Sequence, residues 1–163
     1  QTDELRKETE MSRIAKVGKS EVFAAHLAQG RDMGERNDCA VRAVAAATGR
    51  AYDEIHAMFK AEGRRDARGT PTSITWAVLK QLGLKAEHRA AREFIGRYPG
   101  SHATALKSVT THHPDRFKSV WANGKTYLMF TPGHIIAIVN GVNHDWTRGR
   151  ALRATAIYEV LPA

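Results

Sequence analysis

The chain of 163 residues contains a single cysteine, Cys39. One cysteine cannot form a disulfide within the chain, which excludes a disulfide-stapled secreted scaffold and suits a reducing compartment. No apolar run approaches the roughly 20 residues that a membrane-spanning helix needs. Asp3, Glu4 and Glu8 make the first residues too acidic for a secretory signal. The sequence therefore predicts a cytoplasmic protein that does not contact a membrane.

The sequence also lacks internal repeats and low-complexity segments, and no group of cysteine, histidine and acidic residues has the spacing of a metal site. His112-His113-Pro114 is the stretch richest in histidine, and His102 precedes it. A helix that ends before the proline explains this stretch better than a metal site. We therefore expect neither a metal nor another cofactor.

Hydrophobic residues make up 42% of the chain and charged residues 26%, a balance typical of a folded soluble protein. Its length suffices for one core that needs no disulfide or metal. Leu5, Met11 and Ile14 form a weak helical stripe, and a second amphipathic stretch follows at 20–28. We expect an N-terminal helical extension over residues 1–30 and one folded domain over residues 31–163.

Basic residues outnumber acidic ones and give a formal net charge of +8. Such a charge attracts acidic partners, including nucleic acid. The basic residues are scattered, however, and only 64–68 and 147–150 form small groups, both in expected loops. No recognised nucleic-acid motif accompanies them. We interpret the charge as a source of solubility and a preference for acidic partners, with nucleic-acid binding as the alternative.

Residues Ala40 to Thr48 are mostly alanine and valine and precede Gly49, a pattern that predicts a short, largely buried helix. Cys39 then stands at the first residue of this helix. Unpaired backbone N–H groups and the positive end of the helix dipole favour a thiolate there. Asn37 and Asp38 are both good N-cap residues. A lone cysteine is more often a small apolar core residue, so this position alone does not establish a nucleophile.

Three successive strands are expected between Tyr127 and Trp146. Asn140-Gly141 is the strongest short hairpin signal in the chain, so the strand beginning at His134 should fold back against the strand carrying Asp145. Counting outward from this turn brings His134 and Asp145 near each other. Together with Cys39 at a helix start, they predict a Cys-His-Asp arrangement.

The remaining pattern places helices before strands. Gly30 is expected to end the helix over 20–28, Thr72 or Ser73 to cap a helix that runs to Leu82, and 64–71 to form a basic, flexible loop. This order predicts an α+β fold with a C-terminal antiparallel sheet of about four strands. The other expected elements are helices at 52–63, 94–95 and 104–111 and strands at 84–88 and 154–160.

The chain resembles a small papain-like cysteine peptidase of the kind found among phage and bacterial proteins, over about residues 35–160. The resemblance is carried by Asn37-Asp38-Cys39 before an alanine-rich helix, by Gly133-His134 before alternating aliphatics, and by 140–146. It implies a papain-like fold in which the helix of the nucleophile packs on the sheet. Papain has a glutamine before its cysteine that builds the oxyanion hole, and 31–36 contains none. We therefore assign that role to Asn37.

The resemblance implies a cysteine-dependent hydrolase that cleaves peptide or isopeptide bonds, in the host cytoplasm if the chain is phage-encoded. Cys39 would be the nucleophile, His134 its base, and Asp145 the group that orients the imidazole. We also assign Gly133 and Trp146 to substrate binding. Trp146 would shield the His–Asp hydrogen bond from water, or would simply be a core tryptophan.

Two other functions stay open. A thiol acyltransferase or transglutaminase would use the same Cys39, His134 and Asp145. A non-catalytic protein on a papain-like scaffold would bind a host factor or nucleic acid, although a pure binder has no need of all three residues. His144 should point to the opposite face of a regular strand and receives no role, and His26 is interpreted as a surface or packing residue.

Overall fold

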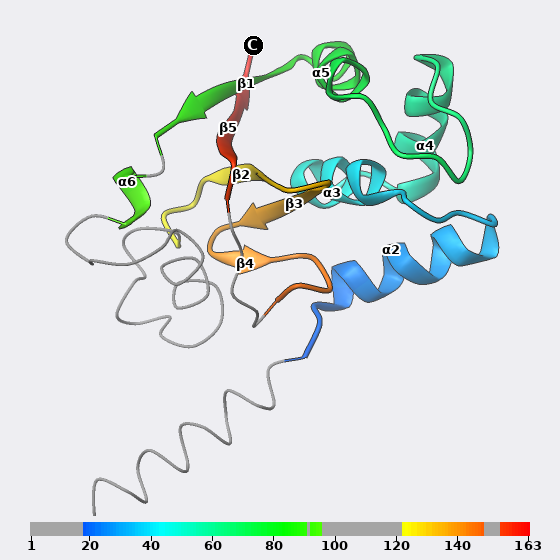
Figure 1. Ribbon diagram of the computed structural model, residues 1–163, viewed down its shortest axis with the longest axis horizontal. Helices are drawn as coiled ribbons and strands as arrows, with labels where there is room; N and C mark the ends of the chain where they lie inside the picture. Colours follow the sequence, from blue (N-terminus) through cyan, green and yellow to red (C-terminus); the bar gives the residue numbers. More distant parts are fainter. Residues whose placement is uncertain (1–17, 91, 96–121, 149–153) are drawn as a thin grey trace, which may run out of the picture.

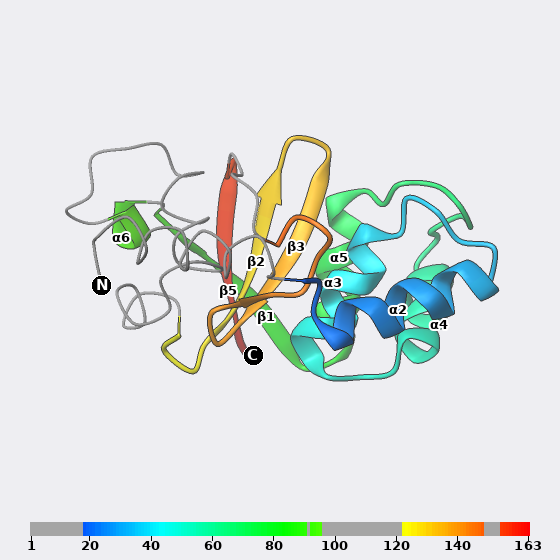
Figure 2. The same cartoon turned by 90° about the horizontal axis from the view of Figure 1, so that it is seen from below.

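The computed structural model describes residues 18–90, 92–95, 122–148 and 154–163. Four longer helices lie on one side of an antiparallel sheet (Figures 1 and 2). The expected α+β class is confirmed, with five strands in the sheet rather than about four. Within the described residues, no helix combines the length and the apolar character needed to cross a membrane.

The helices begin and end close to where the sequence pattern places them. α2 runs over Glu21–Asp32, and its N-cap Ser20 accepts a hydrogen bond from the Phe23 N–H. The expected stop at Gly30 is wrong, because α2 continues past it and Gly30 is buried. The other three longer helices are α3 (Cys39–Thr48), α4 (Tyr52–Ala61) and α5 (Thr72–Gln81).

The cap expected for α5 is wrong. Its N-cap position is Pro71, and no side chain caps the helix there. Thr72 is instead the first helical residue. The expected end of α3 at Gly49 is confirmed. Gly49 adopts a left-handed conformation with φ of 69°, which glycine tolerates and which ends the helix.

The sheet has the order β1-β5-β2-β3-β4, and all neighbouring strands are antiparallel. Asn140 and Gly141 join β3 to β4 as a two-residue hairpin loop. Both have positive φ, 46° and 82°, which is the conformation that fits the twist of the two strands. The strands are β1 (Leu84–Arg89), β2 (Thr126–Thr131), β3 (His134–Val139), β4 (Val142–Asn143) and β5 (Ala156–Pro162).

The central strands β2 and β3 are buried on both faces. Val41, Val44 and Ala45 of α3 are fully buried against one face, where Leu128 and Ala137 belong to the same apolar cluster. The opposite face carries Tyr127, Met129, Ile136, Ile138 and Ile157, which pack with Phe94 of the short helix α6 (Arg92–Ile95). Because α3 packs directly on β3, the first residue of α3 comes close to the first residue of β3.

Some expectations lie outside the described residues. These are the helical stripe before residue 18, the helix at 104–111, and the histidines 102, 112 and 113. The domain boundary expected after residue 30 falls inside α2, which packs on α3 and α4.

Candidate active site

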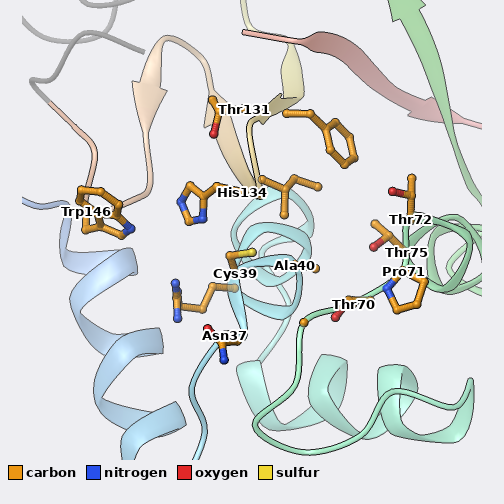
Figure 3. A pocket seen from close by; sticks show the side chains of 15 residues that line it. Asn37, Cys39, Ala40, Thr70, Pro71, Thr72, Thr75, Thr131, His134 and Trp146 are labelled. Atoms are coloured by element: carbon orange, nitrogen blue, oxygen red, sulfur yellow. The ribbon is translucent and has the colours of Figure 1, made fainter. Parts of the chain in front are cut away.

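Cys39 and His134 lie next to each other where α3 and β3 begin (Figure 3), and Asp145 contacts His134. The Nε2 of His134 lies 2.9 Å from the Oδ2 of Asp145. The other ring nitrogen, Nδ1, therefore remains for Cys39, whose thiol is hydrogen-bonded to the His134 side chain. The three residues form one hydrogen-bonded line from sulfur to carboxylate.

Asp145 does not lie on a regular strand, contrary to the sequence-based expectation. β4 ends at Asn143, and Asp145 opens the turn that follows. Its Oδ2 also accepts hydrogen bonds from Thr147, at 3.1 Å from the backbone N–H and 2.7 Å from the hydroxyl. Thr147 is buried, and its hydroxyl accepts a hydrogen bond from the Asn143 side chain. The turn thus fixes the carboxylate that holds His134.

The pKa of Cys39 lies below its ordinary value. Burial has the largest single influence and raises this pKa, but several interactions together outweigh it. His134 is hydrogen-bonded to the sulfur, and the backbone N–H of Ile135 donates to it. The positive charges of His134 and Arg42 act in the same direction. Cys39 therefore has the acidified thiol that nucleophilic chemistry requires.

The pKa of His134 is raised to about 9. Burial is the largest single influence and lowers this pKa. The hydrogen bonds and charges of Asp145 and Cys39 raise it, and together they outweigh burial. At neutral pH these opposite shifts favour a thiolate on Cys39 and an imidazolium on His134.

Asn37 lies on the other side of Cys39 from His134 (Figure 3). Its backbone has a φ of 56°, which is uncommon for a residue other than glycine. Its Nδ2 donates to the Ala67 carbonyl at 3.4 Å, so one N–H of the amide is engaged and the second is left for another acceptor. This is a position from which an amide can face an oxyanion formed at the sulfur.

Asp38 occupies the N-cap position of α3 but makes no side-chain capping hydrogen bond. Its carboxylate instead forms an ion pair with Arg42 and accepts a hydrogen bond from the Tyr52 hydroxyl at 2.6 Å. Burial raises the pKa of Tyr52, and the neighbouring Asp38 raises it further. The capping role expected for Asp38 is therefore wrong, because its side chain links α3 to α4.

Arg42 was not singled out by the sequence analysis. It stands almost one turn after Cys39, contacts the Phe23 ring at 5.5 Å, and lines the same pocket as Cys39. A basic residue three positions after a candidate nucleophile is the signal in the sequence that points to it, because such residues share a helix face.

The pocket has a volume of about 730 Å³. Gly133 belongs to its wall and has a φ of 69° in the two-residue turn between β2 and β3, a conformation that favours glycine. The residues that line the pocket are Asn37, Cys39, Ala40, Arg42, Gly69, Thr70, Pro71, Thr72, Thr75, Phe130, Thr131, Gly133, His134, Ile135 and Trp146.

Trp146 is 42% exposed, so the alternative of a core tryptophan is wrong. Its ring centroid lies 5.8 Å from that of His134, with the two planes at 48°. The indole thus lies beside the imidazole at the mouth of the pocket (Figure 3).

The loop 64–71, expected to be basic and flexible, is instead tied to Glu35. The buried Glu35 carboxylate accepts hydrogen bonds from Arg64, from His56 at 3.0 Å and from the Ala67 backbone N–H. Arg64 is 4% exposed and also donates to the Thr70 hydroxyl at 3.1 Å. This network fixes the loop that provides the pocket wall at Gly69, Thr70 and Pro71.

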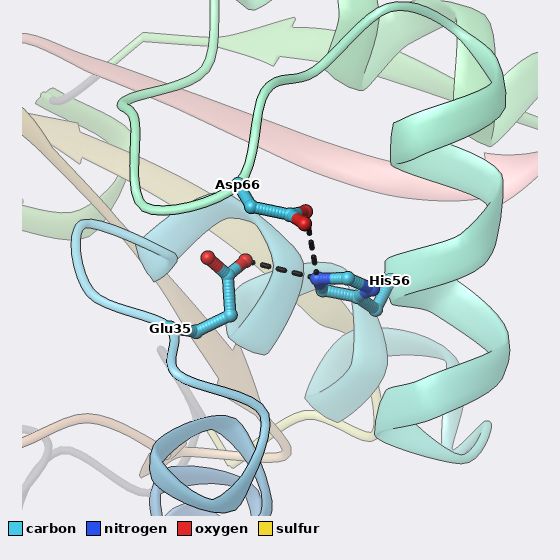
Figure 4. Close-up of side chains that lie close together, drawn as sticks. All are labelled: Glu35, His56 and Asp66. Atoms are coloured by element: carbon cyan, nitrogen blue, oxygen red, sulfur yellow. Dashed lines mark hydrogen bonds and ion pairs between the residues drawn. The ribbon is translucent and has the colours of Figure 1, made fainter.

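Glu35, His56 and Asp66 form the one group among the described residues whose donor atoms suit a metal by proximity, within 4.8 Å of one another (Figure 4). The guanidinium of Arg64 binds the same Glu35 oxygen as His56. Because a cation already neutralises this carboxylate, we assign the cluster a structural role.

The remaining histidines on this side of the molecule are packing residues. His144 Nδ1 lies 2.7 Å from the Ser20 hydroxyl and joins the turn after β4 to the start of α2. Burial lowers the pKa of His144, and the charges of Arg148 and His26 add to this effect. The His26 ring is tilted against the Tyr52 ring, with the centroids 6.1 Å apart and the planes at 37°. Neither histidine belongs to the Cys39 site.

Comparison with protein-family models, with curated proteins and with solved structures found no match for this chain.

Proposed function

We propose that this protein is a cysteine-dependent hydrolase of papain-like fold that cleaves peptide or isopeptide bonds. The observation that carries the proposal is the hydrogen-bonded line from the Cys39 thiol through His134 to Asp145. The start of a helix, the start of a strand and a buried turn provide these three groups. A protein that only binds a partner needs no such line.

In the resting state Cys39 is a thiolate and His134 an imidazolium. The thiolate attacks the carbonyl carbon of the scissile amide, and the carbonyl oxygen becomes an oxyanion. The backbone N–H of Cys39 and the second amide N–H of Asn37 donate hydrogen bonds to this oxyanion. The oxyanion then forms on the side of Cys39 that faces away from His134, consistent with the arrangement in Figure 3.

Collapse of this intermediate breaks the C–N bond. His134 gives the proton on Nδ1 to the leaving nitrogen, which departs as a neutral amine and leaves a thioester on Cys39. The neutral His134 then takes a proton from water at Nδ1, and the hydroxyl attacks the thioester carbonyl. A carboxylic acid leaves and the thiolate–imidazolium pair returns. Asp145 keeps Nε2 protonated throughout by accepting its hydrogen bond.

If an amine attacked the thioester in place of water, the acyl group would pass to the amine and the protein would be an acyltransferase. Hydrolysis of p-nitrophenyl acetate, with and without added hydroxylamine, separates these outcomes without knowledge of the natural substrate. A hydrolase releases acetate at a rate that the amine hardly changes. An acyltransferase turns over rapidly only when the amine is present.

The ion pair itself is tested by the pH dependence of Cys39 alkylation with iodoacetamide. In the wild type we expect thiolate reactivity to persist well below the ~8.5 of a free cysteine, and His134→Ala to abolish this reactivity at low pH. His144→Ala is the matched control, because His144 contacts Ser20 rather than Cys39. A thiol that is inert, or that reacts equally in both variants, contradicts the proposed function.

A further inference from the structure

We infer that the Cys39 pocket accepts an acidic peptide segment, with carboxylate side chains on the wall formed by Asn37 and Gly69. The inference rests on the proposed function, since it names the substrate class of the same site. It is carried by the distribution of charge around the pocket, where the nearby carboxylates are paired with Arg42, Arg64 and His134, and two exposed arginines that form no ion pair with the described residues lie in the adjoining loops.

No carboxylate is among the described residues that line the pocket, whereas Arg42 and His134 both line it. The three acidic residues closest to the site in the chain point into the protein. Glu35 binds Arg64 and His56, Asp38 binds Arg42 and Tyr52, and Asp145 binds His134 and Thr147; each is at least nine-tenths buried. None of these carboxylates is therefore presented to a ligand.

The rim of this wall carries two further cations. Arg36 precedes Asn37, and Arg68 lies between Ala67 and the pocket residue Gly69. The hydrogen bond from Asn37 to the Ala67 carbonyl joins the two loops, so both arginines flank one point of contact. Both are exposed, and in the part of the chain that the structure describes neither forms an ion pair.

Arg36 lies near the nucleophile in the chain. Arg36 and Cys39 are three residues apart, so their Cα atoms are separated by at most about 11 Å. At low salt the screening length is about 30 Å, so the charge of Arg36 acts on a ligand bound at Cys39. The exposed acid on the same loop, Asp66, has Lys60 at 3.3 Å, which offsets its charge. The field at the rim is therefore positive.

The inner wall suits the polar groups of a peptide. Thr70, Thr72 and Thr75 present hydroxyl groups on the side of the pocket away from Trp146 (Figure 3). Thr70 accepts a hydrogen bond from Arg64, which leaves its O–H free to donate to a carbonyl or carboxylate oxygen. Such donors bind acceptor-rich segments without adding a negative charge.

A peptide suits this pocket better than a nucleic acid, which is also anionic. The thiolate needs an acyl carbon, and a nucleic acid backbone offers none. Binding of single-stranded nucleic acid also relies on several aromatic faces on which successive bases stack. Among the described lining residues, Trp146 is the one exposed ring.

The test is fluorescence anisotropy with three labelled hexapeptides, rich in glutamate, glutamine or lysine, on the full-length Cys39→Ala protein, which cannot turn them over. We expect the glutamate peptide to bind at least about tenfold more tightly than the glutamine peptide at low salt, and to lose this preference as salt rises. The double variant Arg36→Gln/Arg68→Gln should remove most of the preference. The matched control Lys80→Gln/Lys85→Gln removes two exposed charges outside this pocket and should retain it.

Equal binding of all three peptides, or equal loss of preference in the two double variants, overturns the inference. Tighter binding of a single-stranded oligonucleotide than of the glutamate peptide overturns it as well. Protection of wild-type Cys39 from iodoacetamide by the glutamate peptide, but not by the lysine peptide, supports it by placing the peptide in the pocket. Because binding is measured without catalysis, its failure leaves the reactivity of Cys39 and the proposed function separately testable.

Discussion

Thr147 donates two hydrogen bonds to the same oxygen of Asp145, at 3.1 Å from its backbone N–H and 2.7 Å from its hydroxyl. That oxygen, Oδ2, is also the one that His134 Nε2 contacts. Three donors thus converge on one atom. An amide carbonyl oxygen can occupy this position as well as a carboxylate oxygen can, so the orientation of His134 and the charge of Asp145 are separable properties.

Asp145→Asn should therefore preserve the orientation of His134 and lose only the negative charge. Without that charge the pKa of His134 falls from about 9. Since the imidazolium donates the proton to the leaving group, activity is lost as pH rises through this pKa, and the alkaline limb moves to lower pH in the variant. Asp145→Ala removes orientation as well and should cost roughly a further 10- to 100-fold in rate. The pH–rate profiles for hydrolysis of a peptide p-nitroanilide, whose leaving nitrogen must be protonated, measure both effects.

The contrary result for this pair is a similar loss in both variants with no movement of the alkaline limb. The amide of Asp145→Asn would then fail to orient His134, and the charge of Asp145 would not set the pKa of His134.

Thr147 should behave as a positioning residue. Thr147→Val keeps the shape of the side chain and the backbone hydrogen bond but removes the hydroxyl. We expect kcat to fall about tenfold with KM nearly unchanged, because substrate does not touch this residue. The Asn143 amide loses an acceptor as well, so the free energy of unfolding should drop by about 1–2 kcal/mol. Steady-state kinetics and urea denaturation check these two effects.

Thr147→Ser restores the hydroxyl and should recover most of kcat. Thr48→Val is the control, because its hydroxyl bonds the Val44 carbonyl at the end of α3 that is far from Cys39. If the valine and serine variants were equally impaired, the hydroxyl would have no part in holding Asp145.

Gly30→Ala should destabilise the protein even though alanine favours a helix over glycine by about 1 kcal/mol. A Cβ at this position of α2 would lie 2.7 Å from the Asp38 carboxylate and 2.9 Å from the Tyr52 hydroxyl. The hydrogen bond that joins these two groups must then open. We expect the free energy of unfolding to fall by about 1–3 kcal/mol in urea denaturation.

Gly18→Ala is its matched control, since a Cβ there meets no atom within 4 Å. An increase in stability for Gly30→Ala would show that Tyr52 and Asp38 can separate at little cost.

Local signals made part of the site predictable from the sequence. Asn140-Gly141 specifies a two-residue turn that folds β4 back along β3, and this much predicts that Asp145 comes near His134. The contact itself is made from the turn after β4 rather than from a strand position. Similarly, the alanine-rich run and Gly49 mark the ends of α3 and place Cys39 at its start. The hairpin and the helix boundary both depend on neighbours in the chain.

The features that the sequence did not reveal depend on residues far apart in the chain. Glu35 and Arg64 meet because α4 returns the chain to the start of α3, and no local pattern records that pairing. Trp146 is exposed in the turn that follows β4, and the sequence did not show that β4 ends as early as Asn143. Pairing of β1 with β5 likewise joins segments more than 60 residues apart.

Glu35→Gln should be the most destabilising of these single substitutions. Its carboxylate is the partner of the buried Arg64 guanidinium, and the glutamine amide leaves that charge without compensation. Breaking a buried pair from one side costs about 3–5 kcal/mol, whereas an exposed pair contributes about 0.5 kcal/mol. Glu54→Gln is the matched control, because Glu54 pairs with Arg50 on the surface with both side chains nearly half exposed.

Urea denaturation of the two variants should therefore separate them by at least about 2 kcal/mol. Loss of the Glu35 carboxylate also releases the Ala67 N–H, so hydrogen exchange at that amide should accelerate in Glu35→Gln and stay unchanged in Glu54→Gln. The same loop forms the pocket wall at Gly69 and Thr70, so peptide binding should weaken in Glu35→Gln. Alkylation of Cys39 should not become slower. Equal small effects in both variants would mean that the loop is held by its backbone and that Glu35 is dispensable to the wall of the site.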